Sequence, residues 1–343
     1  MTDVVRIDPA DDSRWKTFLD RHADATVFHD PAWITLQMQS YGFTQASLAC
    51  ITGDRITGIL PLLQISSPLT GKRGVSLPFS DYGGPLADDP GSMDALMKSA
   101  AALSTERRWK YLELRGNTPP GLGQPAAAFK RHRLQLSPGP DALFRSFDKG
   151  QTQRSVNKFG KSGAVVERRT DMEAVVSFMR LNYRTRRKHG LPPQPDRFFE
   201  ELHRTLLATG RGFVGVARLG GTDLGACLFL LFKDTVYYKF GASDEAQLVH
   251  RPNHGIMWDA IRWAAGEGYR MFDFGRSDLD GEGLIKFKRG WGTEETDLTY
   301  YRMSAGAATR EGGGPIETLK PLLQRMPIPI LKLIGKVLYE HVG

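Results

Sequence analysis

Cysteine and long apolar runs are both scarce in this sequence. Cys50 and Cys227 are the only cysteines among 343 residues, so no disulfide framework is available and a reducing compartment is expected. The longest apolar run, residues 226–232, has the length of a buried strand, far short of the ~20 residues that a membrane-spanning helix needs. We therefore expect a cytoplasmic protein, whose only contact with the inner face of a membrane would be peripheral.

Several common catalytic signatures are also absent. There is no GxxxxGK[ST] phosphate loop and no GxSxG nucleophile elbow, which argues against an NTPase and against the usual hydrolases. His250 and His254 lie four residues apart, but Pro252 stands between them and no glutamate follows His250, so a zinc-binding helix is not expected. The sequence predicts neither a metal nor a bound cofactor.

The basic residues are concentrated in one part of the chain. Lys and Arg number 46 against 38 Asp and Glu, a net charge of +8. Between residues 145 and 190, twelve basic residues occur with four acidic ones, so this stretch carries an excess equal to that of the whole chain. Such a local excess indicates a surface for phosphate or another polyanion. A solvated helix face is the alternative interpretation.

Two stretches about 160 residues apart share one pattern. Residues 93–103 and 256–264 have apolar side chains at helical spacing, and each is followed by a short alternating strand, residues 111–114 and 271–274. Strand–turn–strand patterns precede both, at residues 49–62 and 215–228. The duplication predicts two α/β domains in tandem, which we place at residues 1–145 and 146–310, followed by a tail at 311–343.

The tail combines apolar and basic residues at helical spacing. Pro327 and Pro329 divide it into two short amphipathic helices. We expect the tail to pack back on the first domain; a basic amphipathic helix could instead lie on an anionic membrane.

Six segments of the chain resemble the FemAB-related proteins, which comprise the Fem-type peptidyltransferases and their GNAT-fold relatives. They are residues 77–85 (LPFSDYGGP), 111–115 (YLELR), 185–193 (TRRKHGLPP), 237–243 (YYKFGAS), 273–277 (DFGRS) and 283–292 (GLIKFKRGWG). As a set they are specific to the group, and the 185–193 block resembles its branch associated with exopolysaccharide and PEP-CTERM gene systems. This resemblance implies two tandem GNAT-like domains that form a cleft, in agreement with the duplication.

The resemblance also implies a reaction. Fem-type enzymes transfer an aminoacyl group from aminoacyl-tRNA to an amine of a cell-envelope precursor, without a covalent enzyme intermediate. It assigns Lys288 to the reacting carbonyl, with Lys286 as its alternative, and suggests Asp273 for orienting the amine or accepting its proton. Substrate phosphates are expected at the following residues: Tyr183, Arg186, Arg187, Tyr238 and Arg276. Asp81, in the first of the six segments, is a further binding candidate.

Two other functions remain open. The same fold supports N-acyltransfer from acyl-CoA, although residues 251–255 lack the glycine spacing of a good pyrophosphate loop. The basic stretch could also belong to a non-catalytic module that binds RNA or another polyanion. The expected partners are therefore aminoacyl-tRNA or acyl-CoA and a phosphate-bearing envelope or polysaccharide precursor; the sequence does not indicate an oligomeric state.

Overall fold

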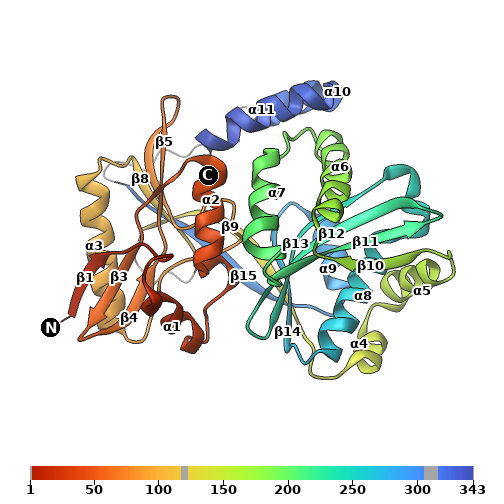
Figure 1. The fold of residues 1–343 in the computed structure, drawn as a ribbon, viewed down its shortest axis with the longest axis horizontal. Helices are drawn as coiled ribbons and strands as arrows, with labels where there is room; N and C mark the ends of the chain where they lie inside the picture. The colour runs from red at the N-terminus through yellow and green to blue at the C-terminus, as the bar shows by residue number, and fades with distance from the viewer. Residues whose placement is uncertain (1, 117–122, 305–315, 343) are drawn as a thin grey trace. The chain divides into compact units, whose positions relative to one another are not determined.

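The computed structural model describes residues 2–116, 123–304 and 316–342 (Figure 1). The chain divides into two compact units. Unit 1 comprises residues 1–128, 298–314 and 335–343, and unit 2 comprises residues 129–297 and 315–334. The predicted α/β class is confirmed, and the predicted boundary at residues 310–311 lies outside the described residues. Within the described ranges, none of the helices has the length and apolar character needed to cross a membrane.

Unit 1 contains two sheets. Their strands follow the orders β1-β3-β4-β7 and β15-β8-β6-β5-β2. The elements are β1 Thr2–Arg6, α1 Ser13–Arg21, η1 Val27–His29, α2 Pro31–Tyr41, β2 Thr44–Gln45, β3 Leu48–Thr52, β4 Arg55–Leu60, β5 Leu63–Ser67, β6 Gly71–Val75, β7 Leu86–Ala87, α3 Pro90–Glu106, β8 Tyr111–Arg115 and most of β15 Glu294–Ser304. The strand β9, Gln124–Gln135, begins in unit 1 and continues into unit 2.

The helix α3 shows how the sequence pattern builds this unit. The Asp89 carboxylate accepts a hydrogen bond from the Ser92 N–H at 2.8 Å and caps the helix. Leu96, Ala100 and Leu103 recur at helical spacing and are buried in the core of the unit.

The loop at residues 77–85, which contains the binding candidate Asp81, is tightly packed within unit 1. The Tyr300 hydroxyl donates to the carbonyl oxygen of Asp81 at 2.6 Å, and Trp33 Nε1 donates to Ser80 Oγ at 2.7 Å. A Cβ atom at Gly84 would lie 1.9 Å from the carbonyl oxygen of Gly116. The glycine in this motif is therefore required by close backbone packing.

His29 in unit 1 should make stability depend on pH. The ring is buried, its Nδ1 accepts from the Thr26 N–H, and its Nε2 lies 3.0 Å from the Gly84 carbonyl oxygen. Burial lowers the pKa of His29 from 6.5 to about 4. Because the unfolded chain binds the proton more readily, the free energy of unfolding should fall as pH drops from about 6.5 to 4.

Urea unfolding measured at intervals across this pH range tests the prediction. In the variant His29→Gln, the free energy of unfolding should depend less steeply on pH, because unfolding of the variant takes up about one proton fewer. A slope equal to that of the wild type would contradict it.

Unit 2 contains one mixed sheet in the order β10-β11-β12-β13-β14-β9. Its elements are α4 Pro140–Ser146, the π-helix η2 Lys149–Gln153, α5 Arg154–Gly160, β10 Val165–Arg169, α6 Met172–Lys188, α7 Asp196–Leu202, the π-helix η3 His203–Leu207, β11 Gly212–Leu219, β12 Thr222–Phe232, β13 Thr235–Ser243, η4 Glu245–His250, α8 Pro252–Gly266, β14 Met271–Asp278, α9 Glu282–Arg289, α10 Ile316–Arg325 and the first half of α11 Ile328–His341. Its core includes the buried aromatic residues Phe213, Phe229, Phe272, Phe274 and Trp291.

The duplication predicted from sequence is present in the two units. In unit 1, α3 lies between the parallel strands β6 and β8, and in unit 2, α8 connects the parallel strands β13 and β14. A strand hairpin precedes each helix: β3–β4 in unit 1 and β11–β12 in unit 2. Each unit therefore contains one parallel pair within an otherwise antiparallel arrangement.

The tail forms two helices, α10 and α11, with Pro327 between them and Pro329 in the first turn of α11. We expected the tail to pack on the first domain, and the contacts of its two helices are as follows. Gln324 Nε2 donates to the carbonyl oxygen of Lys188 at 3.0 Å, and Lys332 pairs with Asp196 at 2.6 Å, both within unit 2. Only the end of α11 packs in unit 1, where the Tyr339 ring contacts Phe79. Of the buried apolar positions of the tail, Leu323 and Leu331 belong to unit 2 and Tyr339 belongs to unit 1.

Candidate active site

The strands β13 and β14 pair over only a short length. Their parallel register joins Thr235 to Met271 and ends at Tyr237 and Asp273, although β13 continues to Ser243 and β14 to Asp278. On its other side, β14 pairs with β9 through a register shift between Asp273 and Arg276. Such an irregularity takes backbone groups out of the regular hydrogen-bonding pattern of the sheet.

Lys288 satisfies backbone groups at this irregularity. Its side chain comes from α9 and is only 2% exposed. The Nζ atom donates to the carbonyl oxygens of Gly275 at 3.1 Å and Arg276 at 2.7 Å. A buried ammonium group is therefore held against the segment of β14 that has separated from β13. In contrast, the neighbouring candidate Lys286 is exposed on the same helix.

Asp273 is buried beside Lys288's backbone partners. Its Oδ2 accepts from Arg131 Nε at 3.0 Å and Nη2 at 2.7 Å, and its Oδ1 accepts from the Gly275 N–H at 2.8 Å. Gly275 has a φ of +70°, which a glycine adopts without strain. The carboxylate thus fixes the turn in β14 and neutralises a cation from β9.

His132 lies on β9 next to Arg131. It is fully buried, and neither ring nitrogen has a hydrogen-bond partner among the described residues. Burial, followed by the charge of Lys288, lowers the pKa of His132 to about 4. This histidine is therefore neutral at pH 7 and adds no positive charge near Lys288.

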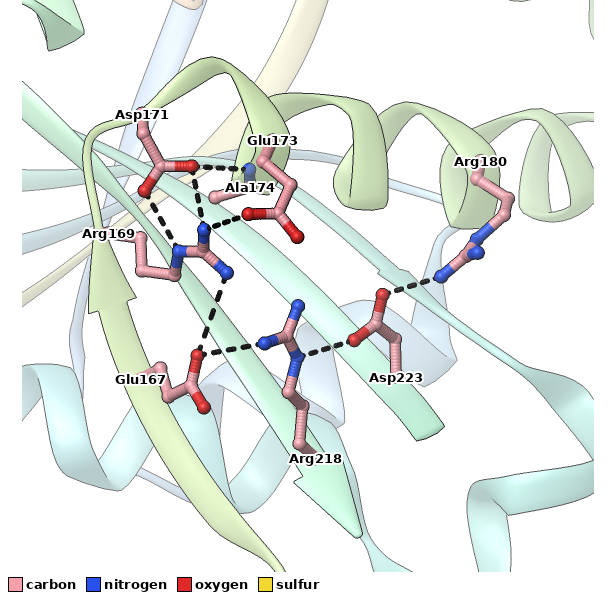
Figure 2. A network of polar contacts seen from close by, with 8 residues as sticks. All are labelled: Glu167, Arg169, Asp171, Glu173, Ala174, Arg180, Arg218 and Asp223. Carbon is pink, nitrogen blue, oxygen red and sulfur yellow. Dashed lines mark hydrogen bonds and ion pairs between the residues drawn. The ribbon is translucent and has the colours of Figure 1, made fainter. Parts of the chain in front are cut away.

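Much of the basic stretch between residues 145 and 190 is neutralised by nearby acids. Figure 2 shows Arg169 surrounded by the carboxylates of Glu167, Asp171 and Glu173, with Arg218 completing the network. Four further cations of the stretch form ion pairs: Arg168 with Asp259, Arg180 with Asp223, Arg184 with Asp244, and Lys188 with Glu245. These cations are poorly suited to bind an external polyanion without breaking existing pairs.

A cavity of about 560 Å³, here called the α6 cavity, lies at the C-terminal end of α6. It is lined by residues from α6, the end of β13, η4, the first turn of α8 and α10. The binding candidate Arg187 lines it and makes no ion pair with the described residues. Gln324 from α10 contributes to the wall. The cavity therefore combines an unpaired cation with the paired Arg184 and Lys188.

A second cavity of about 380 Å³, here called the basic cavity, is lined by residues from η2, α5, the N-cap of α8 and its first turn. Arg154, Lys158 and Arg251 line it, and none of the three forms an ion pair with a described residue. Arg154 and Lys158 are four residues apart on α5, a like-charge spacing that is unfavourable without an anion. No acidic residue lines this cavity. The arrangement is suited to a phosphate group.

His254 adds a polar group to the basic cavity. Its side chain is 9% exposed, and Nε2 has no hydrogen-bond partner within the described part of the chain. Burial, followed by the charge of Arg251, lowers the pKa of His254 to about 4. The ring contacts Phe287 and Trp291, which flank Lys288 in the sequence. This places the first turn of α8 close to the helix that carries Lys288.

The remaining predicted residues do not gather in either cavity. The Tyr183 hydroxyl donates to Asp196 at 2.5 Å, and burial together with this carboxylate raises the pKa of Tyr183. Arg186 donates to the carbonyl oxygen of Pro192 at 3.1 Å. Tyr238 packs against the core, where burial and its contact with Cys227 raise its pKa. The Arg276 guanidinium stacks 3.9 Å from the centre of the Phe129 ring.

The sequence comparisons identify a domain and several relatives. Residues 147–289 match the model of the acetyltransferase (GNAT) domain. Lipid II:glycine glycyltransferases from Staphylococcus epidermidis and Staphylococcus haemolyticus are 33% and 32% identical over 127 residues. The match covers 34% of this chain and spans only 29% of the length of these relatives. Residues 147–289, less than half of the chain, therefore belong to the acetyltransferase (GNAT) domain family.

Solved structures share the fold of this chain. FemX superposes with a TM-score of 0.68 at 15% identity, covering 94% of this chain and 100% of FemX. A tandem GNAT protein from the clavulanic acid biosynthesis pathway has a TM-score of 0.56 at 14% identity, covering 90% and 100%. At these identities the likeness shows the fold alone, and it agrees with the two tandem GNAT-like units.

Several residues near Lys288 and Asp273 or in the basic cavity were not singled out from the sequence. Arg131 and His132 on β9, together with Arg154, Lys158 and His254, belong to this group. Arg154 and Lys158 were part of the basic stretch, and their separation of four residues was the available signal. Nothing in the sequence indicated that β9 would pair with β14 and bring Arg131 to Asp273.

Proposed function

We propose that this protein is an N-acyltransferase that transfers an aminoacyl group from aminoacyl-tRNA to an amine of a cell-envelope or polysaccharide precursor. The observation that carries the proposal is the basic cavity, which has three unpaired cations from α5 and the N-cap of α8. The first turn of α8 lies next to the helix of Lys288. The relatives named as lipid II:glycine glycyltransferases support the reaction type.

The proposed reaction converts an ester into an amide. The acceptor amine attacks the carbonyl carbon of the aminoacyl ester, the C–O bond to the tRNA breaks, and the amine proton is transferred as the ribose hydroxyl leaves. Such a step needs the two substrates held in line and positive charge near the developing oxyanion. We assign the charge to Lys288, whose ammonium is held by two carbonyl oxygens. No protein nucleophile is required.

The two cavities take separate parts in this proposal. The basic cavity binds a phosphate near the 3′ end of the donor, through Arg154, Lys158 and Arg251. The α6 cavity binds the phosphate-bearing acceptor through Arg187. Asp273 orients the β14 turn through Arg131 and Gly275, and its direct role toward the amine remains a prediction.

Acyl-CoA is the second candidate donor. The match to the acetyltransferase (GNAT) domain favours it, and the basic cavity would also suit the phosphates of CoA. The two donors are distinguished by incubating the protein with labelled aminoacyl-tRNAs and a lipid-and-nucleotide extract, with labelled acyl-CoA thioesters in parallel. Transfer from aminoacyl-tRNA that ribonuclease pretreatment abolishes supports the proposal. Transfer from the thioesters alone would overturn it.

Removing the charges of the basic cavity should weaken tRNA binding and its dependence on salt. In the triple variant Arg154→Gln, Lys158→Gln, Arg251→Gln, up to three phosphate contacts are lost. The slope of log K against log salt concentration should then decrease by about 2, at ~0.7 per single-strand phosphate contact. Filter binding of deacylated tRNA between about 50 and 200 mM salt measures this slope.

Lys161→Gln is the matched control for this experiment. Lys161 is exposed and belongs to the same basic stretch, but it does not line the basic cavity. An equal change in slope for Lys161→Gln and the triple variant would show that general surface charge, rather than the cavity, binds the RNA.

A further inference from the structure

The two tail helices expose an apolar surface, here called the tail face. It consists of five side chains: Leu319 (46% exposed), Leu322 (59%), Ile330 (48%), Leu333 (63%) and Val337 (52%). The first two lie on α10 and the others on α11, which follow one another along the chain (Figure 1). Single exposed apolar residues are common, whereas five within 19 positions of two amphipathic helices form a surface that favours a partner.

On α11, the tail face lies opposite the side by which the helix packs on the protein. On α11, Ile330, Leu333 and Val337 follow the i, i+3, i+7 spacing of a single helix face. Leu331 and Tyr339, on the other side of this helix, are buried. On α10, Leu323 is buried while its neighbour Leu322 is exposed. The helices are therefore anchored by one side while the apolar face remains uncovered.

Free cations accompany the tail face. Arg325, at the end of α10, and Lys336, on α11, are exposed and form no ion pair with described residues. The basic end of α6 lies beside α10, as the hydrogen bond from Gln324 to Lys188 shows. An apolar stripe with flanking cations is complementary to an anionic lipid surface, where apolar side chains enter the acyl boundary and cations meet the headgroups. Two like-charged copies of the face would instead repel each other.

We propose that the tail face docks this protein on a membrane rich in anionic lipid. The docked helices lie in the plane of the interface, and no helix crosses the bilayer. Gln324 of α10 also lines the α6 cavity, so docking brings this cavity close to the headgroup layer. This consequence rests on the proposed function, in which the α6 cavity binds the acceptor, here a lipid-linked one. The docking itself does not rest on the proposed function.

Co-sedimentation of the full chain with lipid vesicles tests the docking. The wild type should bind vesicles that contain phosphatidylglycerol and bind pure phosphatidylcholine vesicles much more weakly. Leu322→Asp with Leu333→Asp should reduce binding at least tenfold. Arg325→Gln with Lys336→Gln should reduce binding to anionic vesicles by about 25-fold, which is about fivefold for each charge removed.

Val176→Asp is the matched control. Val176 is 53% exposed on α6, outside the tail face, and its replacement should leave vesicle binding unchanged. Circular dichroism of each variant verifies the fold, since all the altered side chains are exposed.

Three outcomes would overturn the docking proposal. They are the absence of binding to anionic vesicles, binding that the aspartate variants do not weaken, and a wild-type dimer that Leu322→Asp with Leu333→Asp converts to monomers in sedimentation velocity. The last outcome would identify a second copy as the partner of the tail face. Transfer to a water-soluble acceptor tests the proposed function separately, because it requires no vesicle.

Discussion

Replacing Lys288 with methionine should reduce the rate of aminoacyl transfer by about 10²- to 10³-fold, the effect typical of losing one donor to a developing oxyanion. The methionine side chain has a similar length, so it fills the same buried space without the ammonium. We expect the loss in kcat, because the charge is most useful in the transition state. Single-turnover transfer at saturating donor measures this effect.

Lys288 also has a structural task that the experiment must separate from catalysis. Its ammonium satisfies the carbonyl oxygens of Gly275 and Arg276 where β14 departs from regular pairing. Lys288→Arg retains a positive charge and hydrogen-bond donors, although the guanidinium group has a different shape. A purely structural role predicts that activity follows the melting temperature in both variants. A catalytic role predicts a folded Lys288→Met protein with little activity.

The exposed lysine on the same helix provides the comparison. Lys286→Met should change the transfer rate by less than about twofold if Lys288 is the reacting-site lysine, since exposed substitutions rarely disturb the fold. Loss of activity in Lys286→Met with activity retained in Lys288→Met would reverse the assignment.

The helices and their flanking strands could be predicted because they depend on local patterns. Apolar residues at helical spacing and the flanking short strands locate α3 and α8 in the sequence, and their repetition indicates two similar units. The prolines likewise divide the tail into α10 and α11. These signals depend on residues close together in the chain.

The surroundings of individual side chains could not be predicted in the same way. The register of β12 and β13 shifts between Leu228 and Phe229, and one such shift changes the face on which the following side chains lie. Tyr238, which pairs with Phe229 directly after this shift, packs against the core and lines neither the α6 cavity nor the basic cavity. Similarly, Arg169 and Arg154 belong to one basic stretch, but only Arg169 is surrounded by carboxylates (Figure 2).

Asp273→Ala should lower the free energy of unfolding by about 3–5 kcal/mol, the cost of breaking a buried ion pair by removing one partner. The substitution removes the carboxylate that pairs with the guanidinium of Arg131 and accepts from the N–H of Gly275. Urea unfolding followed by circular dichroism measures the loss. A change below about 1 kcal/mol would contradict the structural role assigned to this carboxylate.

The double variant Arg131→Met, Asp273→Leu tests whether the pair acts as a unit. Replacing both charges with apolar side chains leaves neither ion unpaired, so the double variant should be more stable than Asp273→Ala. The activity of Asp273→Asn then tests whether the carboxylate takes part in the transfer reaction, because the asparagine amide oxygen still accepts from the Gly275 N–H and keeps the turn in place. A folded Asp273→Asn protein with nearly normal transfer would limit Asp273 to positioning the β14 turn. A folded but inactive protein would instead support its predicted role toward the acceptor amine.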